Sequence, residues 1–435
     1  MNSALTRRRF LGRTAAGVAG FWLAAPFLSR ASRKFSPNDK LNIGFVGTAG
    51  QAEFSLGNLK DQNIAALCDV DEKKLAAAAQ RFPSARTYRD FRRLIEQKDL
   101  DAIVVATPDH THAVASVAAL QSGRHLYCEK PLARTVSETR IVTGLARKSN
   151  LVTQIGTQIH SGSNYRRVVE LVRSWAIGNV EEVHVWVASS YGGKDLPKDS
   201  PPVPSNLDWE LWLGPVESRP YHPEYVPFNW RNWWAFGGGS LADFGCHYMD
   251  LPFWALDLHH PTTIEAEGPP VHPESTPPWA IVRYEFPERI KEGAKHPPVK
   301  LTWYHGGKHP ERLTDEQFAK WKSGVLFVGS RGMLLADYGR HVLLPEKEFE
   351  GFVKPPPFIK ESIGHHKEWV EAIKLGGSTT CRFDYSGPLT ETALLGNVAF
   401  HVGRKLEWDF AEMKAMNCPE ADRYLQHHYR RGWKI

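Results

Sequence analysis

A short run of small residues has the composition and spacing of a phosphate-binding turn. Gly47, Ala49 and Ala52 form a G-x-A-x-x-A version of the G-x-G-x-x-G/A pattern, directly after the apolar segment 41–46. Asp69 follows about 20 residues further on, where a carboxylate can hold the ribose hydroxyls of a dinucleotide. Because Asp69 would repel a 2′-phosphate and no arginine adjoins it in the sequence, the pattern favours NAD over NADP.

A second set of residues has the spacing of an acid–base pair. Asp243 and His247 are four residues apart in the segment GGGSLADFGCHYMD. Residues four apart on a helix share one face, so a carboxylate and an imidazole can converge on one substrate oxygen. A histidine has a pKa near neutrality, so His247 could act as a general base toward a substrate hydroxyl. A pair of this spacing is equally typical of a solvent-exposed helix face, and the residues alone leave both interpretations open.

The elements that must position these residues alternate between strands and helices. Strands are predicted at 41–46, 64–68, 102–106 and 125–128. Helices are predicted from the turn to about residue 59, at 71–81 and at 114–121, with a loop at 107–111. This alternation predicts a doubly wound parallel sheet of the Rossmann type, whose ligands lie at the carboxyl ends of the strands.

Beyond residue 151 the pattern changes. Segments 183–187, 280–286 and 300–304 alternate as half-exposed strands do, which predicts one open sheet with a substrate site. Segment 192–225 is rich in Pro, Gly and Ser and predicts a long excursion over the surface or over a partner subunit. We therefore expect an NAD(P)-binding domain at 38–153 and a substrate-binding domain at 154–435, which ends in a helical segment.

The first residues read as an export signal. Arg7, Arg8 and Arg9 precede an apolar stretch at 14–28 that is short and alanine-rich, as in a twin-arginine signal peptide. We expect a signal peptide at 1–31, cleaved near Ala31, recognition by the twin-arginine export machinery and a periplasmic or otherwise exported location. An uncleaved membrane anchor is the alternative.

Charge and cysteine usage exclude other classes of function. The formal net charge is +6, but residues 1–31 hold five arginines and no acid, so no patch for nucleic acid is indicated. The five cysteines are widely spaced and contain no C-x-x-C. Neither a disulfide framework nor a zinc site is signalled, and we predict no metal.

Four segments carry a resemblance to a known family: LNIGFVGTAGQA, CDVDEKKL, VVATPDHTHAVASVAALQSGRHLYCEKPLA and GGGSLADFGCHYMD. Over roughly residues 40–425 the sequence resembles the Gfo/Idh/MocA oxidoreductases. The resemblance implies an α/β protein whose N-terminal Rossmann domain binds NAD(P). It also implies a C-terminal α/β domain with an open, mainly antiparallel sheet, carbohydrate or polyol substrates, and a homo-oligomer.

The resemblance also implies roles for single residues. Lys130, in Glu129-Lys130-Pro131, matches the family lysine that contacts the reacting hydroxyl and the cofactor, and Asp243 and His247 match its D-x-x-x-H pair. The expected cofactor contacts are Gly47, Thr48, Ala49, Gly50, Gln51, Ala52, Asp69, Thr107, Pro108, His110, His112, Glu129 and Lys130. The expected substrate contacts are Lys130, Gln158, His160, Tyr165, Arg231, Asp243 and His247. The tryptophans around Arg231 are expected mostly to pack.

Export constrains the reaction, because an exported dehydrogenase meets no pool of free NADH. We therefore expect a tightly bound NAD(P) that exchanges hydride with a hydroxyl of a sugar, glycoside or polyol, as in a glycoside dehydrogenase or a glucose-fructose oxidoreductase. A redox-neutral glycosidase or epimerase that acts through a transient 3-keto sugar is one alternative. A catalytically silent sugar-binding protein that retains the nucleotide is another.

Overall fold

Six parallel strands form the first sheet, in the order β3-β2-β1-β4-β5-β6. They are β1 (Asn42–Val46), β2 (Asn63–Cys68), β3 (Arg86–Tyr88), β4 (Ala102–Val105), β5 (His125–Cys128) and β6 (Thr153–Ile155). The order reverses between β1 and β4, so the ligand crevice of this sheet opens at their carboxyl ends. The predicted doubly wound sheet is confirmed, and β6 carries it slightly past residue 153.

The helices of this domain connect successive strands. They are α1 (Gln51–Asn58), α2 (Glu72–Arg81), α3 (Phe91–Ile95), α4 (Asp109–Gln121) and α5 (Val136–Ser149). Helix α4 begins at Asp109, in a segment where the sequence predicts a loop. Pro108 is extended just before it, and a carboxylate in the first turn of a helix is favourable. His110 and His112 are therefore helical and buried.

Nine strands form the second sheet, in the order β15-β14-β13-β7-β12-β9-β8-β16-β17. They are β7 (Val180–Val187), β8 (Thr263–Glu267), β9 (Ala280–Phe286), β12 (Val299–His305), β13 (Gly324–Gly329), β14 (Gly332–Ala336), β15 (His341–Leu344), β16 (Leu406–Asp409) and β17 (Lys414–Ala415). Strands β7 and β12 pair in parallel and the other pairs are antiparallel. A separate hairpin joins β10 (Arg289–Lys291) and β11 (Ala294–His296).

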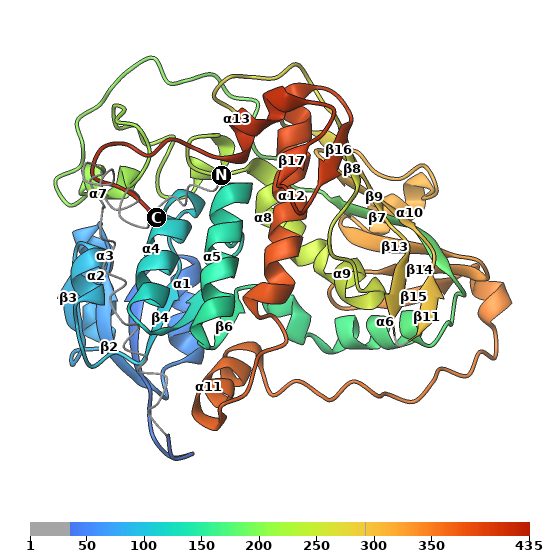
Figure 1. Ribbon diagram of the computed structural model, residues 1–435, viewed down its shortest axis with the longest axis horizontal. Coiled ribbons are helices and arrows are strands. Elements are labelled where there is room, and N and C mark those ends of the chain that lie inside the picture. The colour runs from blue at the N-terminus through green and yellow to red at the C-terminus, as the bar shows by residue number, and fades with distance from the viewer. Residues whose placement is uncertain (1–34, 292) are drawn as a thin grey trace, which may run out of the picture.

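Helices of the second half of the chain lie between and around the two sheets (Figure 1). They are α6 (Ser163–Arg173), α7 (Trp209–Leu213), α8 (Gly239–Tyr248), α9 (Asp250–Leu256), α10 (Asp315–Lys320), α11 (His365–Leu375), α12 (Phe383–Val402) and α13 (Asp422–Leu425). The long helix α12 packs against both α5 and α8, so it joins the first domain to the helix that carries Asp243 and His247. Within residues 35–291 and 293–435 there are also four 3-10 turns, at Gln158–Ser161, Asn229–Asn232, Glu346–Phe349 and Pro419–Ala421.

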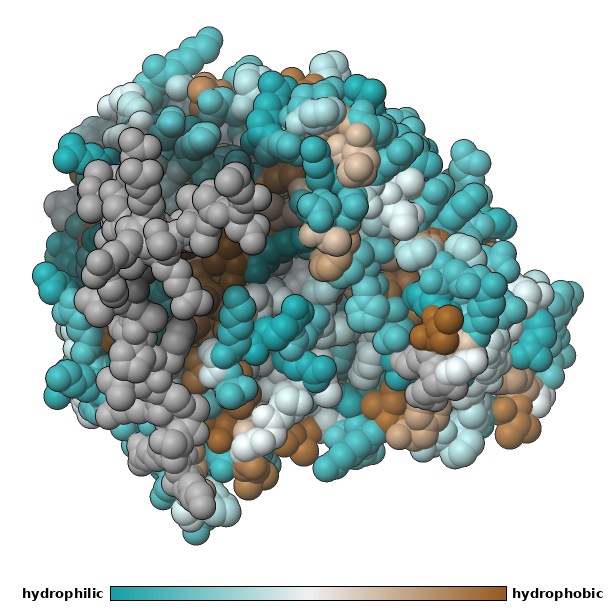
Figure 2. All heavy atoms as spheres, viewed as in Figure 1, coloured by the Kyte–Doolittle hydropathy of each residue, from teal (hydrophilic) through white to brown (hydrophobic). Residues whose placement is uncertain are grey.

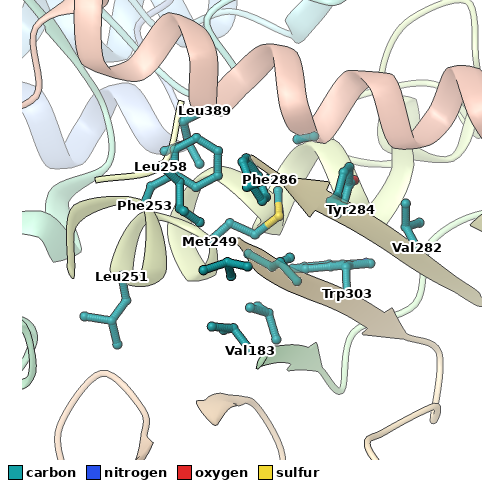
Figure 3. Packing of buried hydrophobic residues seen from close by; sticks show 14 of the residues in the cluster. Val183, Met249, Leu251, Phe253, Leu258, Val282, Tyr284, Phe286, Trp303 and Leu389 are labelled. Atoms are coloured by element: carbon teal, nitrogen blue, oxygen red, sulfur yellow. The ribbon is translucent and has the colours of Figure 1, made fainter. Parts of the chain in front are cut away.

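The largest core lies beneath the second sheet. Side chains of β7, β9 and β12, such as Val183, Tyr284 and Trp303, interdigitate with Met249, which lies between α8 and α9, and with Phe253 of α9 (Figure 3). All five are almost fully buried. This packing fixes α8 and α9 against the sheet, because core side chains at native density leave little room for a helix to shift.

The Pro- and Gly-rich excursion folds back onto the first domain of its own chain. The backbone N–H of Asp208 donates to the carbonyl of Val70 at 2.9 Å, and that of Glu72 donates to the carbonyl of Asn206 at 2.8 Å. Both bonds join the excursion to the loop that follows β2. Of the two predicted locations, the structure shows this segment over the surface of its own chain.

The structure described is a computed structural model covering residues 35–291 and 293–435, so the predicted signal peptide at 1–31 lies outside the described residues. Within the described ranges, no helix has both the length and the apolar character needed to cross a membrane. Hydrophilic residues predominate on the face shown in Figure 2. All five cysteines are buried and unpaired.

Candidate active site

The turn after β1 has the backbone that a phosphate-binding turn requires. Gly47 has φ +92°, and a Cβ there would lie 2.4 Å from the carbonyl oxygen of Ala106. Only glycine fits such a close approach. Gly50 has φ +61° at the N-cap of α1, and no side chain caps that helix. The positive end of α1 is therefore left to an anion such as a pyrophosphate.

A cavity of about 510 Å³ opens at this turn, within the range of small-molecule sites. Its walls come from both domains and from the excursion. Of the residues predicted from the sequence, it is lined by Gly47, Ala49, Gly50, Gln51, Asp69, Thr107, Pro108 and Arg231. Thr48 and Ala52 are buried behind the turn and are not among the residues that line it.

Asp69 is held in place at the end of β2. Its Oδ2 accepts hydrogen bonds from the backbone N–H of Thr48 at 3.0 Å and from the Thr48 hydroxyl at 2.9 Å. Its Oδ1 accepts from the backbone N–H of Asp71 at 3.0 Å. Oδ1, which accepts one hydrogen bond, has a further lone pair, so the anchored group can still accept from a ribose hydroxyl.

The fold brings an arginine beside Asp69 that sequence adjacency does not reveal. Arg89 directly follows β3, and the backbone N–H of Asp69 donates to the carbonyl of Tyr88 at 3.2 Å. Arg89 lines the cavity, but its guanidinium lies 2.7 Å from Glu72 Oε1 and 3.8 Å from Asp208 Oδ2. The two acids offset its charge, so this end of the cavity stays unfavourable for a 2′-phosphate.

Lys130 and Asp243 meet across the domain boundary. The Lys130 ammonium group donates to Asp243 Oδ1 and, at 2.8 Å, to the backbone carbonyl of Asp243. Arg231 Nε lies 3.2 Å from the same carboxylate oxygen. Because Arg231 also lines the cavity, its side chain connects the nucleotide cleft to this pair.

The charges at this point keep Asp243 ionised. Burial by itself would raise the pKa of Asp243, but Lys130 and Arg231 more than offset it and hold the pKa well below its usual range. Asp243 thus stays a carboxylate throughout the neutral range. A lysine with two of its three N–H donors on Asp243 has one donor left for a substrate oxygen.

His247 lies one helical turn after Asp243 on α8. Burial and the neighbouring Lys130 charge lower the pKa of His247 to about 3, although Asp243 acts in the opposite direction. The ring is therefore neutral at pH 7, and its buried Nδ1 has no hydrogen-bond partner within the described chain. This pKa is lower than the near-neutral value expected from the sequence, mainly because the ring is buried, and the charge of Lys130 lowers it further.

Two buried carboxyl groups flank the site. Burial and the Asp243 charge raise the pKa of Asp109 to about 8. Burial raises the pKa of Glu129 to about 7. The sequence analysis includes Glu129 among the cofactor contacts but not Asp109. Residues 107–111 were predicted as a loop, whereas Asp109 is the first residue of α4 and lies beside Lys130. An acid after Thr107-Pro108 at a strand end was the available signal.

Gln158 connects the start of the second domain to this group. Its side-chain nitrogen donates to Glu129 Oε1 at 3.0 Å and to the Tyr127 hydroxyl at 2.9 Å. A Cβ on Gly156 would lie 2.2 Å from Glu129 Oε2, so the chain passes close to the carboxyl group. Gln158 therefore positions Glu129, and Gln158 does not line the cavity.

Four of the residues predicted as contacts are buried and do not line the cavity. His110 is 1% exposed and its Nε2 bonds to the carbonyl of Trp212 at 2.8 Å. His112 bonds through its two ring nitrogens to the carbonyls of Pro131 and Thr107, each at 2.7 Å. Both histidines hold the loops that shape the site, and neither lines the cavity.

His160 and Tyr165 are the other two. His160 Nδ1 lies 3.0 Å from both oxygens of Asp250, and its ring stacks on Trp254 at 3.9 Å. Together with Cys381, His160 and Asp250 form a group whose atoms could in principle bind a metal ion. The hydrogen bond between His160 and Asp250 already explains why two of the three lie together. Tyr165 is fully buried, and its hydroxyl donates to the backbone carbonyl of His247 at 3.4 Å.

The tryptophans of the excursion mainly pack, as expected. Trp209, Trp212, Trp230 and Trp233 belong to one apolar cluster with Tyr225 and Phe236. Trp212 and Trp230 also line the cavity. The guanidinium carbon of Arg231 lies 4.2 Å from the Trp230 ring centroid, a distance at which a cation and an aromatic face attract. The cluster therefore positions Arg231.

Comparison with solved structures confirms the fold. A structure described as an NAD-binding protein from Listeria innocua covers 90% of this chain and 100% of its own, with a TM-score of 0.61 and 15% identity. A levoglucosan dehydrogenase in complex with NADH and levoglucosan covers 85% of this chain and 99% of its own, with a TM-score of 0.55 and 18% identity. At these identities the likeness shows the fold alone.

Curated relatives match part of the chain. Levoglucosan dehydrogenase of Pseudarthrobacter phenanthrenivorans is 31% identical over 188 residues, which cover 42% of this chain and 40% of the relative. Inositol 2-dehydrogenase of Salmonella typhimurium is 26% identical over 146 residues, which cover 33% and 43%. In both cases the chain spans less than half of the relative's own length.

Two family models match consecutive parts of the chain. One is described as an oxidoreductase family with an NAD-binding Rossmann fold and matches residues 41–157. The other is described as the C-terminal alpha/beta domain of an oxidoreductase family and matches residues 176–295. These ranges correspond to the parallel sheet and to the beginning of the mixed sheet. The chain belongs to the Gfo/Idh/MocA family of oxidoreductases.

Proposed function

We propose that the protein exchanges hydride between a retained NAD and a hydroxyl-bearing carbon of a sugar, glycoside or polyol. One observation carries the proposal: Lys130, Asp243 and Arg231 form a single charged group that reaches the nucleotide cavity through Arg231. The curated relatives named above are a levoglucosan and an inositol dehydrogenase, and their substrates are of this class.

The residues present fit NAD. The turn at Gly47 and the uncapped end of α1 suit a pyrophosphate, and the anchored Asp69 suits an adenosine ribose. Bound NAD would supply the hydride acceptor at its nicotinamide ring. Arg89 is paired with Glu72 and Asp208, so its charge is not free to bind the 2′-phosphate of NADP, and the site favours NAD.

Alcohol oxidation is divided among three side chains: Lys130 and Asp243 of the charged group, and the neighbouring His247. Lys130 directs its remaining N–H at the substrate oxygen and stabilises negative charge that develops there. The neutral His247 ring accepts the hydroxyl proton. Asp243 fixes Lys130 and can accept a hydrogen bond from a neighbouring hydroxyl of a polyol. In the reverse direction the same groups return the proton to a ketone oxygen.

Export through the twin-arginine pathway and assembly into a homo-oligomer are part of this proposal. Arg7 and Arg8 with the apolar stretch support export, and family resemblance supports the oligomer. Localisation of the full chain against a variant with Arg7→Lys and Arg8→Lys tests the first point. Failure of the unmodified chain to leave the cytoplasm would contradict it.

The central experiment uses the purified full chain. Nucleotide is released by denaturation, identified and quantified, and native protein is then mixed with levoglucosan, myo-inositol and glycosides while the near-ultraviolet absorbance of reduced nicotinamide is followed. We expect bound NAD, or binding of added NAD, and reduction by at least one substrate. Product formation without reduced nicotinamide would favour the redox-neutral alternative. No nucleotide binding would overturn the proposal.

A further inference from the structure

The last ten residues of the chain leave the second domain and run over the first. After α13, segment 426–435 crosses toward α3 and α4, where the C-terminus lies (Figure 1). The Tyr429 hydroxyl donates to Glu138 Oε1 on α5 at 2.5 Å. Trp433 lies against Phe91 of α3, with ring centroids 6.0 Å apart, and the Arg92 guanidinium carbon is 4.7 Å from its ring. The segment is therefore docked on the first domain at several points.

Trp433 is a wall of the nucleotide cavity. It lines the same end as Asp69, Arg89 and Phe91. In a sheet of this kind the pyrophosphate faces the first turn and the carboxylate after β2 takes the adenosine ribose. The adenine ring must then lie beyond Asp69, toward the edge strand β3. Trp433 borders that place.

This end of the cavity would otherwise open at the edge of the sheet, because β3 is the outermost strand. The tail covers it, and the tail is in turn bound to the excursion. The Arg430 guanidinium donates to the carbonyl of Gly214 at 2.6 Å and pairs with the Glu210 carboxylate. The backbone N–H of Arg430 donates to the carbonyl of Pro215 at 3.0 Å.

The excursion is itself fixed to the first domain. His110 on α4 holds the carbonyl of Trp212, and a Cβ on Gly214 would lie 2.7 Å from a methyl carbon of Thr111. Asn206 and Leu207 of the excursion also line the cavity. Two segments that are distant in sequence therefore close over one cleft and are joined through Arg430.

We infer that the tail 426–435 is part of the nucleotide site: Trp433 contacts the adenine of a bound dinucleotide, and the Arg430 link to the excursion slows its release. The inference rests on the proposed function, because it concerns the nucleotide assigned there. It explains how one chain retains a cofactor, since adenine leaves only when the tail and the excursion separate.

The test measures binding rather than activity. Trp433→Ala is compared with Trp433→Phe, with Arg430→Ala and with a chain that ends at Gln426. Trp175→Ala is the matched control, because this tryptophan is 41% exposed and lies in the second domain. Each protein is assayed for nucleotide released on denaturation and for the rate at which bound NADH is displaced by excess NAD. Melting curves establish that each variant is folded.

Loss of an aromatic contact to a base lowers affinity by about 5- to 150-fold. We expect Trp433→Ala to displace NADH faster by a factor in this range, Trp433→Phe to recover most of the difference, and Arg430→Ala to accelerate release without changing affinity for AMP. Trp433→Ala should also weaken AMP binding and leave nicotinamide mononucleotide binding unchanged, because only the adenosine end is altered.

The outcomes separate the inference from the proposed function. If the unmodified chain binds NAD but Trp433→Ala releases NADH no faster than Trp175→Ala, the inference is wrong and the proposed function stands. If the unmodified chain binds neither NAD nor NADP, the proposed function is wrong, and the inference about the tail is wrong with it. If the shortened chain does not fold, the point substitutions still decide.

Discussion

Lys130 and Asp243 come from different domains and are joined twice, through the side-chain Oδ1 and through the backbone carbonyl of Asp243 at 2.8 Å. The second bond holds the Lys130 ammonium group against the backbone of α8, in addition to the Asp243 side chain. An ammonium group held by two of its donors has one direction left for the third. The relative placement of the two domains therefore sets where a substrate oxygen can lie.

The first prediction concerns this pair. Lys130→Met should lower turnover by about 10²- to 10³-fold, as the loss of one donor to a developing oxyanion does. Bound NAD should remain, because the cavity walls are unchanged and Asp243 keeps Arg231 at 3.2 Å. Steady-state kinetics and nucleotide quantification check both points. Lys194→Met, at an exposed lysine paired with Glu224, is the control; full activity of Lys130→Met would exclude the assigned role.

His247 provides a second prediction. His247→Ala should lower kcat by about 10²- to 10⁴-fold, the usual contribution of a positioned base, with little change in NAD affinity. Imidazole added to the buffer should restore part of the activity, which a purely structural role would not allow. His259→Ala removes an exposed histidine and should have no effect. Absence of rescue together with lost NAD binding would indicate a structural role.

Cofactor preference gives the third prediction. Glu72→Gln combined with Asp208→Asn removes the charges that offset Arg89. Asn at 208 retains the cap on α7, where Asp208 accepts from Leu211. Surface ion pairs are worth about 0–1 kcal/mol, so affinity for NADP should rise about 2- to 5-fold relative to NAD. Titration of both nucleotides measures the ratio. An unchanged ratio, equal to that of Glu217→Gln, would show that Arg89 does not face the 2′ position.

The fourth prediction concerns pH and Asp109. The folded state raises the pKa of this carboxyl to about 8, against about 4 in the unfolded chain. Between these values the unfolded chain ionises first, so the group lowers stability progressively as pH rises from about 4 to about 8. Asp109→Asn removes this effect.

The Tm of Asp109→Asn should therefore equal that of the unmodified chain near pH 4 and exceed it near pH 8. A difference on the order of 2–4 °C corresponds to about 1 kcal/mol for a domain of this size. Thermal unfolding across this pH range measures it, with Glu181→Gln, at an exposed carboxyl, as the control. A constant Tm difference across the range would show that Asp109 does not change its ionisation on folding.

Local sequence patterns predicted many of the helices and strands. The strands at 125–128 and 280–286 and the helix that ends at Arg81 agree with the structure. The first strand is mainly buried, the second alternates between buried and more exposed residues, and Asp71 caps α2. The start of α4 was missed, since Thr107-Pro108 is a turn signal and the following histidines look polar. These histidines are buried because they contact Trp212 and Pro131, which lie outside α4 and further along the chain.

Tertiary structure alone decided which polar residues line a site. His160 and Tyr165 have side chains suited to sugar binding, yet packing against Asp250 and beneath His247 buries them. Arg89 gave no signal by itself, and the only signal for Asp109 was its place after a strand end. The importance of both residues comes from the charges that the fold brings beside them.

The sequence by itself determined that a Rossmann turn with Gly47 and Asp69 precedes a Lys130 signature and an Asp243–His247 pair, because local spacing fixes which residues share a turn or a helix face. Only the tertiary structure decided that Lys130 meets Asp243 and that Trp433 reaches the nucleotide cleft. These contacts join segments far apart along the chain. Their formation depends on how α8, the excursion and the tail pack, and no local pattern encodes that packing.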